Sequence, residues 1–180
     1  MSTLGLRFVL DTNAVDDESA EMAELRQMWR DGWIELTRTD TMDTELTQRE
    51  DAEHRARLLS LSGEMIEQFG PMVLGHSRLG FCVVGSDQEA AEWDRLWEVM
   101  FPGRDRATAK KNDVRDAMHV ATAIRYGINV LITSDKRLLK RADEVKAAFN
   151  GFSIMAPAQA LAFSRRMLAR HELRINNPRP

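Results

Sequence analysis

Four acidic side chains stand where the sheet of an α/β protein would bring them together. Asp11 directly follows the apolar run 6–10, and Asp135 follows the apolar run 130–133. Glu45 comes after a second apolar run, 34–37, and Asp116 lies early in the helical pattern that precedes the third. Ligands of parallel α/β sheets bind beyond the carboxyl ends of the strands. We therefore expect these four acids to converge at one edge of a sheet.

Four carboxylates at one place would repel each other and raise one another's pKa values unless a cation neutralised them. Mg²⁺ or Mn²⁺ suits such a site, because both ions prefer oxygen ligands and bind substrate phosphates. The single cysteine, Cys82, excludes a Cys-rich zinc site and an internal disulfide. We interpret it as a buried structural thiol. The reaction class that follows is metal-assisted hydrolysis of a phosphodiester.

Two neighbours of Asp116 have open roles. Asp113 lies one turn earlier and is either a further metal ligand or a helix cap or dipole partner. His119 lies three residues later, on adjacent helix surface, and we favour a packing or hydrogen-bonding role over direct catalysis. Each of the four acids also has a structural explanation, such as a turn residue for Asp11 and an N-cap for Asp135.

The pattern of apolar residues predicts strands alternating with helices. Strands are expected at 6–10, 34–37, 130–133 and 152–155, and helices at 19–32, 39–66, 86–100, 112–126, 136–149 and from 157. Residues 72–85 indicate irregular structure or a small hairpin. Crossovers of this length favour an α/β fold with a parallel sheet and helices on both faces. We expect one domain over residues 1–175, followed by a flexible tail at 176–180.

Composition is that of an ordinary globular protein, with 43% hydrophobic and 29% charged residues in a chain of 180. No window approaches the roughly 18 apolar residues that a membrane span needs. The chain is therefore expected to be cytoplasmic and to have no contact with a membrane.

Charge is distributed unevenly along the chain. Residues 1–100 hold 21 acidic and 9 basic side chains, whereas residues 101–180 hold 7 and 16. Clustered basic side chains can hold a phosphate backbone, although solvated helix faces explain each cluster equally well. The candidates for nucleic-acid binding are Lys110, Lys111, Arg115, Lys136, Arg165 and Arg166.

Four motifs in order resemble the PIN-domain ribonucleases. They are Val-Leu-Asp-Thr-Asn at 9–13, the acid Glu45, Asp-Ala-Met-His-Val-Ala-Thr-Ala at 116–123 and Thr-Ser-Asp at 133–135. The resemblance implies a three-layer PIN-like fold with an enlarged segment at about 70–106. It also implies RNA as substrate, Mg²⁺ or Mn²⁺ as cofactor, and, in a toxin-type member, an antitoxin protein as partner. A homodimer is a further expectation.

The resemblance assigns roles to particular residues. Asp11, Glu45, Asp116 and Asp135 would form the catalytic acids, and Asn13 and Thr133 would support them. The metal would bind to Asp11, Asp116 and Asp135, with Glu45 and Asp113 as additional candidate ligands.

Other enzyme classes fit the motifs less well. A haloacid-dehalogenase-like phosphotransferase needs a second aspartate two positions after the first, where this chain has Asn13. The glycine-rich loops of Rossmann and P-loop nucleotide binders follow none of the predicted strands. The alternative that stays open is a PIN-like module that binds RNA or protein without cutting it.

Overall fold

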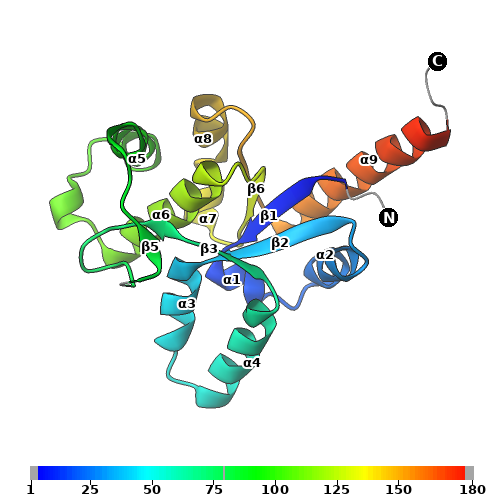
Figure 1. Ribbon diagram of the computed structural model, residues 1–180, viewed down its shortest axis with the longest axis horizontal. Coiled ribbons are helices and arrows are strands. Elements are labelled where there is room, and N and C mark those ends of the chain that lie inside the picture. The colour runs from blue at the N-terminus through cyan, green and yellow to red at the C-terminus, as the bar shows by residue number, and fades with distance from the viewer. Residues whose placement is uncertain (1–3, 79, 177–180) are drawn as a thin grey trace.

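The computed structural model describes residues 4–78 and 80–176, and their side chains as far as residue 173. Five parallel strands form its main sheet, in the order β3-β2-β1-β6-β7 (Figure 1). They are β1 (Leu6–Leu10), β2 (Ile34–Thr39), β3 (Ile66–Gln68), β6 (Val130–Ile132) and β7 (Ser153–Met155). The predicted α/β class with an all-parallel sheet is confirmed.

The order of the strands reverses direction between β1 and β6. From β1 the chain proceeds outward to β2 and β3, and it later returns to the other side of β1 to form β6 and β7. Such a reversal leaves a crevice beyond the carboxyl ends of the two central strands. Asp11 follows β1 at this point, and Thr133 follows β6.

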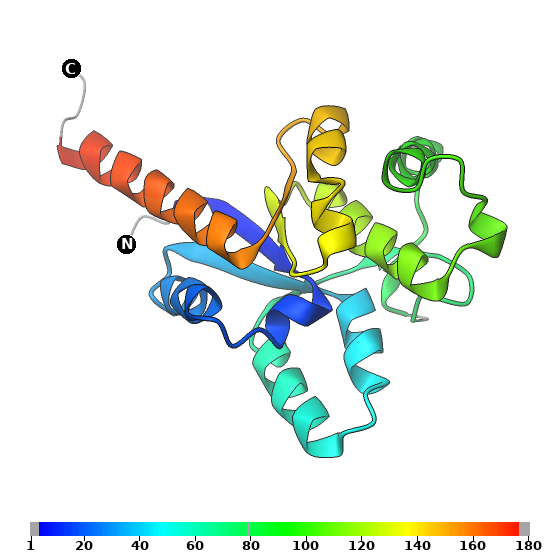
Figure 2. The ribbon, with the colours of Figure 1, turned by 180° about the vertical axis from the view of Figure 1, so that it is seen from behind.

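Helices cover both faces of the sheet, as Figures 1 and 2 show. One face carries α1 (Thr12–Val15), α2 (Ala20–Arg30) and α9 (Pro157–Asn176). The other carries α5 (Asp87–Met100), α6 (Lys111–Arg125), α7 (Lys136–Leu139) and α8 (Ala142–Ala148). The helices α3 (Asp40–Thr47) and α4 (Ala52–Gly63) follow β2 and precede β3.

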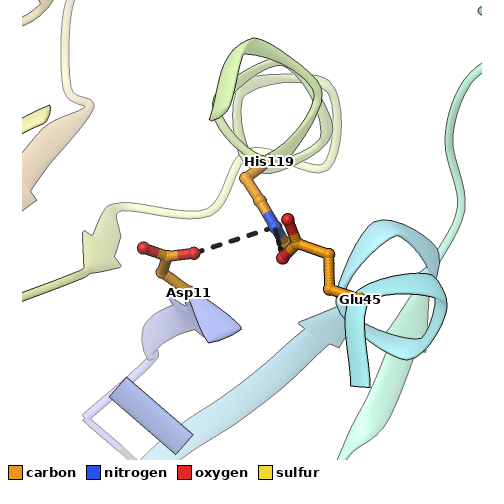
Figure 3. Close-up of side chains that lie close together, drawn as sticks. All are labelled: Asp11, Glu45 and His119. Carbon is orange, nitrogen blue, oxygen red and sulfur yellow. Dashed lines mark hydrogen bonds and ion pairs between the residues drawn. The ribbon is translucent and has the colours of Figure 1, made fainter. Parts of the chain in front are cut away.

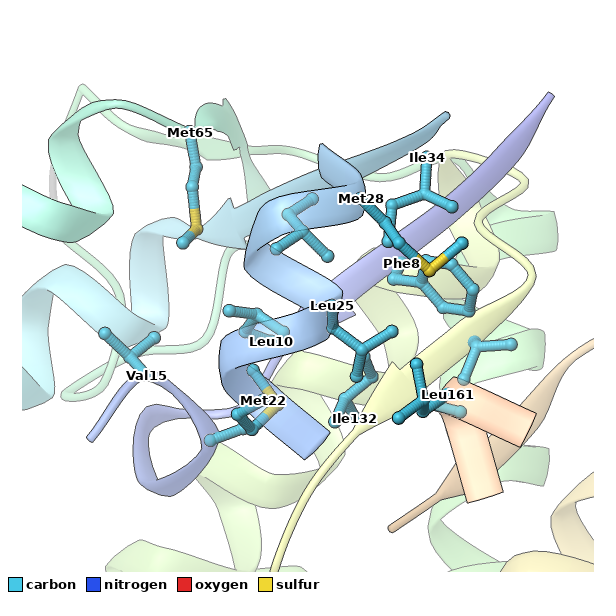
Figure 4. Close-up of a cluster of buried hydrophobic side chains, with 14 of the residues drawn as sticks. Phe8, Leu10, Val15, Met22, Leu25, Met28, Ile34, Met65, Ile132 and Leu161 are labelled. Atoms are coloured by element: carbon cyan, nitrogen blue, oxygen red, sulfur yellow. The ribbon is translucent and has the colours of Figure 1, made fainter. Parts of the chain in front are cut away.

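The strands bury both of their faces, which explains why they read as continuous apolar runs. Phe8 and Leu10 point into the core beneath α2 and α9 (Figure 4), whereas Val9 points into the core beneath α5 and α6. All three are fully buried, and each such side chain contributes roughly 1.5–3 kcal/mol through removal from water. This alternation fixes the register of β1 and hence the position of Asp11.

Two long helices predicted from the sequence are each two helices. The stretch 39–66 divides into α3 and α4, because the Asp51 side chain caps a new helix by accepting from the His54 amide, and its last part forms β3. The stretch 136–149 divides into α7 and α8 around Arg141, which does not have helical backbone angles. Helix α6 begins at Lys111, so neither Asn112 nor Asp113 is its N-cap.

The segment 70–106 has two structurally different parts. Its first part contains β4 (Gly70–Pro71) and β5 (Cys82–Val83), which pair in parallel. Of the two alternatives predicted for residues 72–85, the hairpin is therefore wrong. Cys82 is half-buried rather than buried. The second part is α5, which packs Leu96, Trp97 and Met100 into the core with α6 before the short helix η1 (Arg106–Thr108).

Asn176, the first residue of the predicted tail, belongs to α9. Residues 177–180 of that tail lie outside the described residues. Within residues 4–78 and 80–176, none of the helices combines the length and apolar character of a bilayer-spanning segment.

Gly70 packs closely against α3 and α6, and we predict that Gly70→Ala destabilises the fold. The Gly70 amide donates to Asp40 Oδ1 at 2.8 Å, and an added Cβ would lie 2.8 Å from both that oxygen and Thr122 Oγ1. Because both partners are fully buried, relief of the clash should cost about 1–3 kcal/mol in the free energy of unfolding.

Urea denaturation measures this effect, and Gly63→Ala is the matched control. A Cβ at Gly63 meets no heavy atom within 4 Å, so that variant should be at least as stable as the wild type. Equal stability of the two variants would contradict the close approach at Gly70.

Candidate active site

The four acids singled out in the sequence line one cavity at the carboxyl end of the sheet. Its volume is about 280 Å³. Asp11 comes from the end of β1, Glu45 from α3, Asp116 from α6 and Asp135 from the loop after β6. The remaining lining residues are Thr12, Asn13, Arg49, Asn112 and Arg137.

Asp11 is held by three hydrogen bonds at the centre of the site. Its Oδ1 accepts from the Thr12 amide at 2.7 Å, and its Oδ2 accepts from Asn13 Nδ2 at 2.8 Å and from Thr133 Oγ1 at 2.7 Å. Thr133 Oγ1 also accepts from the Asp135 amide at 2.9 Å. One buried hydroxyl therefore links the loop after β1 to the loop after β6, and Asn13 and Thr133 lie where a supporting role requires.

Asp11 and Asp135 are also helix caps. The Asp11 side chain caps α1, and the Asp135 side chain caps α7 by accepting from the Arg137 amide at 2.6 Å. The structural and the functional interpretations of these acids are compatible, because a carboxylate has about four lone-pair positions and a cap uses one. Capping also fixes the direction in which each carboxylate is presented.

His119 lies between two of the acids, as Figure 3 shows. Its Nε2 is 3.3 Å from Glu45 Oε2 and 3.8 Å from Asp11 Oδ1, and its Nδ1 is 2.7 Å from Thr39 Oγ1. Burial alone would lower the pKa of His119, but the hydrogen bond to Glu45 and the charges of Glu45 and Asp11 raise that pKa to about 9. The ring is therefore an imidazolium at neutral pH and a counter-ion to both carboxylates.

Glu45 is the acid that the geometry selects from the polar stretch after β2. It also accepts from Thr12 Oγ1, and its pKa is lowered despite burial because His119 donates to it. Asp40 is directed to the Gly70 amide, and Asp43 is paired with Arg38. Asp40 and Asp43 are the other acids of this polar stretch, and neither of them lines the cavity.

Arg137 neutralises the opposite side of the site. Its Nη2 lies 2.8 Å from Asp135 Oδ2 and 3.2 Å from Asp116 Oδ2, and its Nη1 lies 3.2 Å from Asp113 Oδ1. Although burial opposes it, the bond to Arg137 keeps the pKa of Asp135 below its usual value. Asp116 differs, because burial first and then the charge of Asp11 raise its pKa to about 7.

Asp113 is buried but does not line the acid cavity. It accepts from Arg104 Nη1 at 2.8 Å and also contacts Arg137. The structure thus places Asp113 behind the site as an anchor for two arginines, and its assignment as a metal ligand stays a prediction.

The basic residues proposed for nucleic-acid binding are divided between two regions. Lys111 and Arg115 donate to Gln48 near the acid cavity, and Lys110 lies at the start of α6. In contrast, Arg165 is paired with Glu24 of α2, and Arg166 lies one residue further along α9. Neither of these two arginines of α9 lines the acid cavity.

His119 has the hydrogen-bonding role expected from its place on the helix surface beside Asp116, with Thr39 and Glu45 as its partners. Sequence reasoning missed other residues of the site. Arg137 lies in the capped turn after Asp135, which folds its side chain back onto the acids. Arg49 and Asn112 line the cavity without any local signal in the sequence.

Residues 88–145 match the sequence model of the PIN domain family. The matched segment, about a third of the chain, is similar to the PIN domain. It contains Asp116, His119, Asp135 and Arg137, whereas Asp11 and Glu45 lie outside it. The match agrees with the resemblance that the motifs at 116–123 and 133–135 indicated.

Among solved structures, the chain is similar to a crystal structure of VapBC2 from Rickettsia felis bound to a DNA fragment from their promoter. The identity is 11% and the TM-score is 0.49, over 84% of this chain and 98% of the other. No curated protein matches the chain.

The acids of the site could hold a metal ion. One oxygen each of Asp11 and Glu45 and a ring nitrogen of His119 lie within 4.8 Å of one another. Because the protonated His119 acts as a counter-ion to the two acids, the carboxylate oxygens are the available ligands. Burial and the neighbouring charge of Asp11 raise the pKa of Asp116. A bound cation would favour the ionised form of this carboxyl, so the site fits a divalent ion.

The raised pKa of Asp116 predicts a pH-dependent stability difference between the wild type and Asp116→Asn. Between about pH 4 and 6.5 the folded wild type retains a proton on Asp116 that the unfolded chain, with a pKa of 3.8, releases. Wild-type stability therefore declines relative to the variant as pH rises, by at most about 1.4 kcal/mol per pH unit. Folded His119 stays protonated in this range, and its titration in the unfolded chain near pH 6.5 is common to the wild type and the variant, so it cancels in the comparison.

Urea denaturation in EDTA at several pH values measures the difference. The same subtraction for Asp143→Asn, an exposed acid on α8, is the control. A difference for Asp116→Asn that does not change with pH would contradict the raised pKa.

Proposed function

We propose that this PIN domain is a metal-dependent ribonuclease that hydrolyses phosphodiester bonds of RNA through Mg²⁺ or Mn²⁺ bound by carboxylates. The observation that carries the proposal is the convergence of four acids, from four separate elements, on one cavity at the switch point of a parallel sheet. Local capping accounts for Asp11 and Asp135 singly, but it does not account for the burial of Asp116 beside Asp11.

Oxygen donors dominate the proposed metal site, which is the ligand chemistry that Mg²⁺ and Mn²⁺ prefer. Asp11, Asp116 and Asp135 would hold the ion, with Glu45 as a further ligand. When bound, the ion would supply Lewis-acid stabilisation of the charge that develops on the phosphate and would acidify a water molecule.

The chain's own residues orient the site. The three hydrogen bonds to Asp11 leave about one lone-pair position free on a carboxylate that cannot rotate away. His119 fixes Glu45, and Arg137 fixes Asp116 and Asp135. Arg49 also lines the cavity, where a guanidinium can pair with a phosphate oxygen of the substrate.

The proposal predicts that the purified protein cleaves a mixed-sequence single-stranded RNA with Mg²⁺ or Mn²⁺ and not with EDTA. Asp11→Asn and Asp116→Ala should each reduce the rate at least about 100-fold, because each removes a charged group that contacts the ion. Gel electrophoresis of end-labelled RNA measures cleavage, and circular dichroism checks that the variants fold.

Asp143→Asn, which changes an acid that does not line the acid cavity, should retain the wild-type rate. Unchanged turnover in folded Asp11→Asn would overturn the site assignment. Binding of RNA in EDTA, with no cleavage under any metal condition, would favour the alternative of a PIN-like module that binds RNA or protein without cutting it.

We further propose that the protein is the toxin of a toxin-antitoxin pair. The support is the resemblance to PIN domains, among which toxins are common. Induced expression of the wild type in a bacterial host should then arrest growth, and expression of Asp116→Ala should not. Growth curves measure the effect, and normal growth with abundant folded wild-type protein would contradict the toxin role. An antitoxin partner and a homodimer remain predictions.

A further inference from the structure

A second and larger cavity lies directly beside the acid cavity. Its volume is about 490 Å³, within the range of roughly 300–1,000 Å³ that is typical of ligand sites. It lies between the α5–α6 connection and the α7–α8 region, so the end of the segment 70–106 forms one of its walls. Asp116 and Arg137 line both cavities, which makes the two spaces neighbours across a shared boundary.

The lining of this second cavity is strongly basic. Five cationic side chains face two carboxylates, and the cations are Arg104, Lys110, Arg137, Lys140 and Arg141. Asp113 and Asp116 are the two acids, and they are already engaged by Arg104 and Arg137. Among the described residues, Lys110 and Lys140 form no ion pair within 4.0 Å. Their charge is therefore available to an anionic ligand.

The rest of the lining is apolar and includes an aromatic ring. Met100, Phe101, Pro102 and Leu138 supply this surface. Phe101 is half-buried and is supported from behind by Trp97, with ring centroids 4.8 Å apart. Trp97 is in turn held by a hydrogen bond from its Nε1 to the Arg104 carbonyl at 2.8 Å. The ring is therefore held in place in the wall of the basic cavity, with the Arg104 guanidinium carbon 5.9 Å from its centroid.

We propose that this cavity binds a nucleotide of the RNA strand next to the one that enters the acid site. The inference rests on the proposed ribonuclease function and specifies how its substrate is held. Lys110 and Lys140 contact the phosphate backbone, and the base lies against Phe101. Basic grooves combined with aromatic platforms are how proteins hold single-stranded nucleic acid without reading its sequence.

The chemistry of the lining argues for a nucleotide rather than a simple anion. An inorganic anion would use the cations but not the apolar side of the cavity, whereas a nucleotide presents a phosphate and an aromatic base together. Asp116 and Arg137, shared with the acid site, set the direction in which the strand continues.

The test measures RNA binding in EDTA, where no metal-dependent cleavage can occur. The probe is a fluorescein-labelled, mixed-sequence RNA of ten nucleotides, and the readout is fluorescence anisotropy at several salt concentrations. In Lys110→Ala/Lys140→Ala we expect affinity to drop at least about tenfold at low salt and the salt dependence to lose about 0.7 per phosphate contact removed. Neither side chain caps a helix, so the variant should fold.

Lys146→Ala/Arg170→Ala is the matched control, because it removes the same charge from positions outside both cavities. It should keep at least half of the wild-type affinity. Equal losses in the two double variants would mean a general charge effect and would overturn the proposal, as would absence of RNA binding by the wild type.

Phe101→Leu tests the platform separately. This variant should weaken binding of the RNA about fivefold or more, since stacking on an aromatic ring is lost, and should leave binding of inorganic tripolyphosphate unchanged. Equal effects on both probes would show an anion site only and would overturn the nucleotide assignment.

Failure of this inference is distinguishable from failure of the nuclease proposal. If the lysine variant shows metal-dependent cleavage and binds RNA with wild-type affinity, the assignment of this cavity is overturned and the nuclease proposal stands. Specific loss of RNA binding in that variant, with no cleavage by the wild type, would support the cavity and overturn the nuclease.

Discussion

Four carboxylates that share one small cavity repel each other, and much of the surrounding structure compensates for this repulsion. His119 neutralises Glu45 and Asp11 on one side, and Arg137 neutralises Asp135 and Asp116 on the other. Both cations come from the segment 111–139, which contributes two of the acids as well. Asp116 keeps a raised pKa of about 7, because its burial and the charge of Asp11 outweigh the effects of His119 and Arg137. A cation bound among the carboxylates would lower that pKa.

The topology of the sheet explains why the repulsion occurs at all. Parallel pairing on both sides of β1 forces the loops after β1 and β6 to lie at the same edge, and the reversal of strand order opens a crevice between them. Thr133 stabilises this edge, because its hydroxyl bonds to Asp11 and to the Asp135 amide. The fold thus brings the acids together through backbone pairing that is independent of their charge.

Helix α6 connects the acid site to the neighbouring basic cavity. Asp116 and His119 are directed to the acids, while Val114 and Met118 pack in the core that includes α5. The connection from α5 to α6, in turn, supplies Phe101 and Arg104 to the basic cavity. A segment that is remote in sequence from Asp11 therefore shapes the space beside the acid site.

Local sequence determined the elements and the position of each acid relative to its own strand or helix. The apolar run before Asp11 and the one before Asp135 predict buried strands, and these strands form as expected because burial of alternate faces fixes their register. Breaks inside helices were harder to predict from the sequence. The cap at Asp51 and the turn at Arg141 interrupt stretches whose apolar pattern continues across them.

Only the tertiary structure decided which of Asp40, Asp43 and Glu45 faces the cavity, because all three lie on one short helix and differ only in their partners from distant elements. It also decided that His119 and Arg137 are counter-ions in the site. Such roles depend on distances between residues far apart in the chain, and a charge has no partner until the fold supplies one.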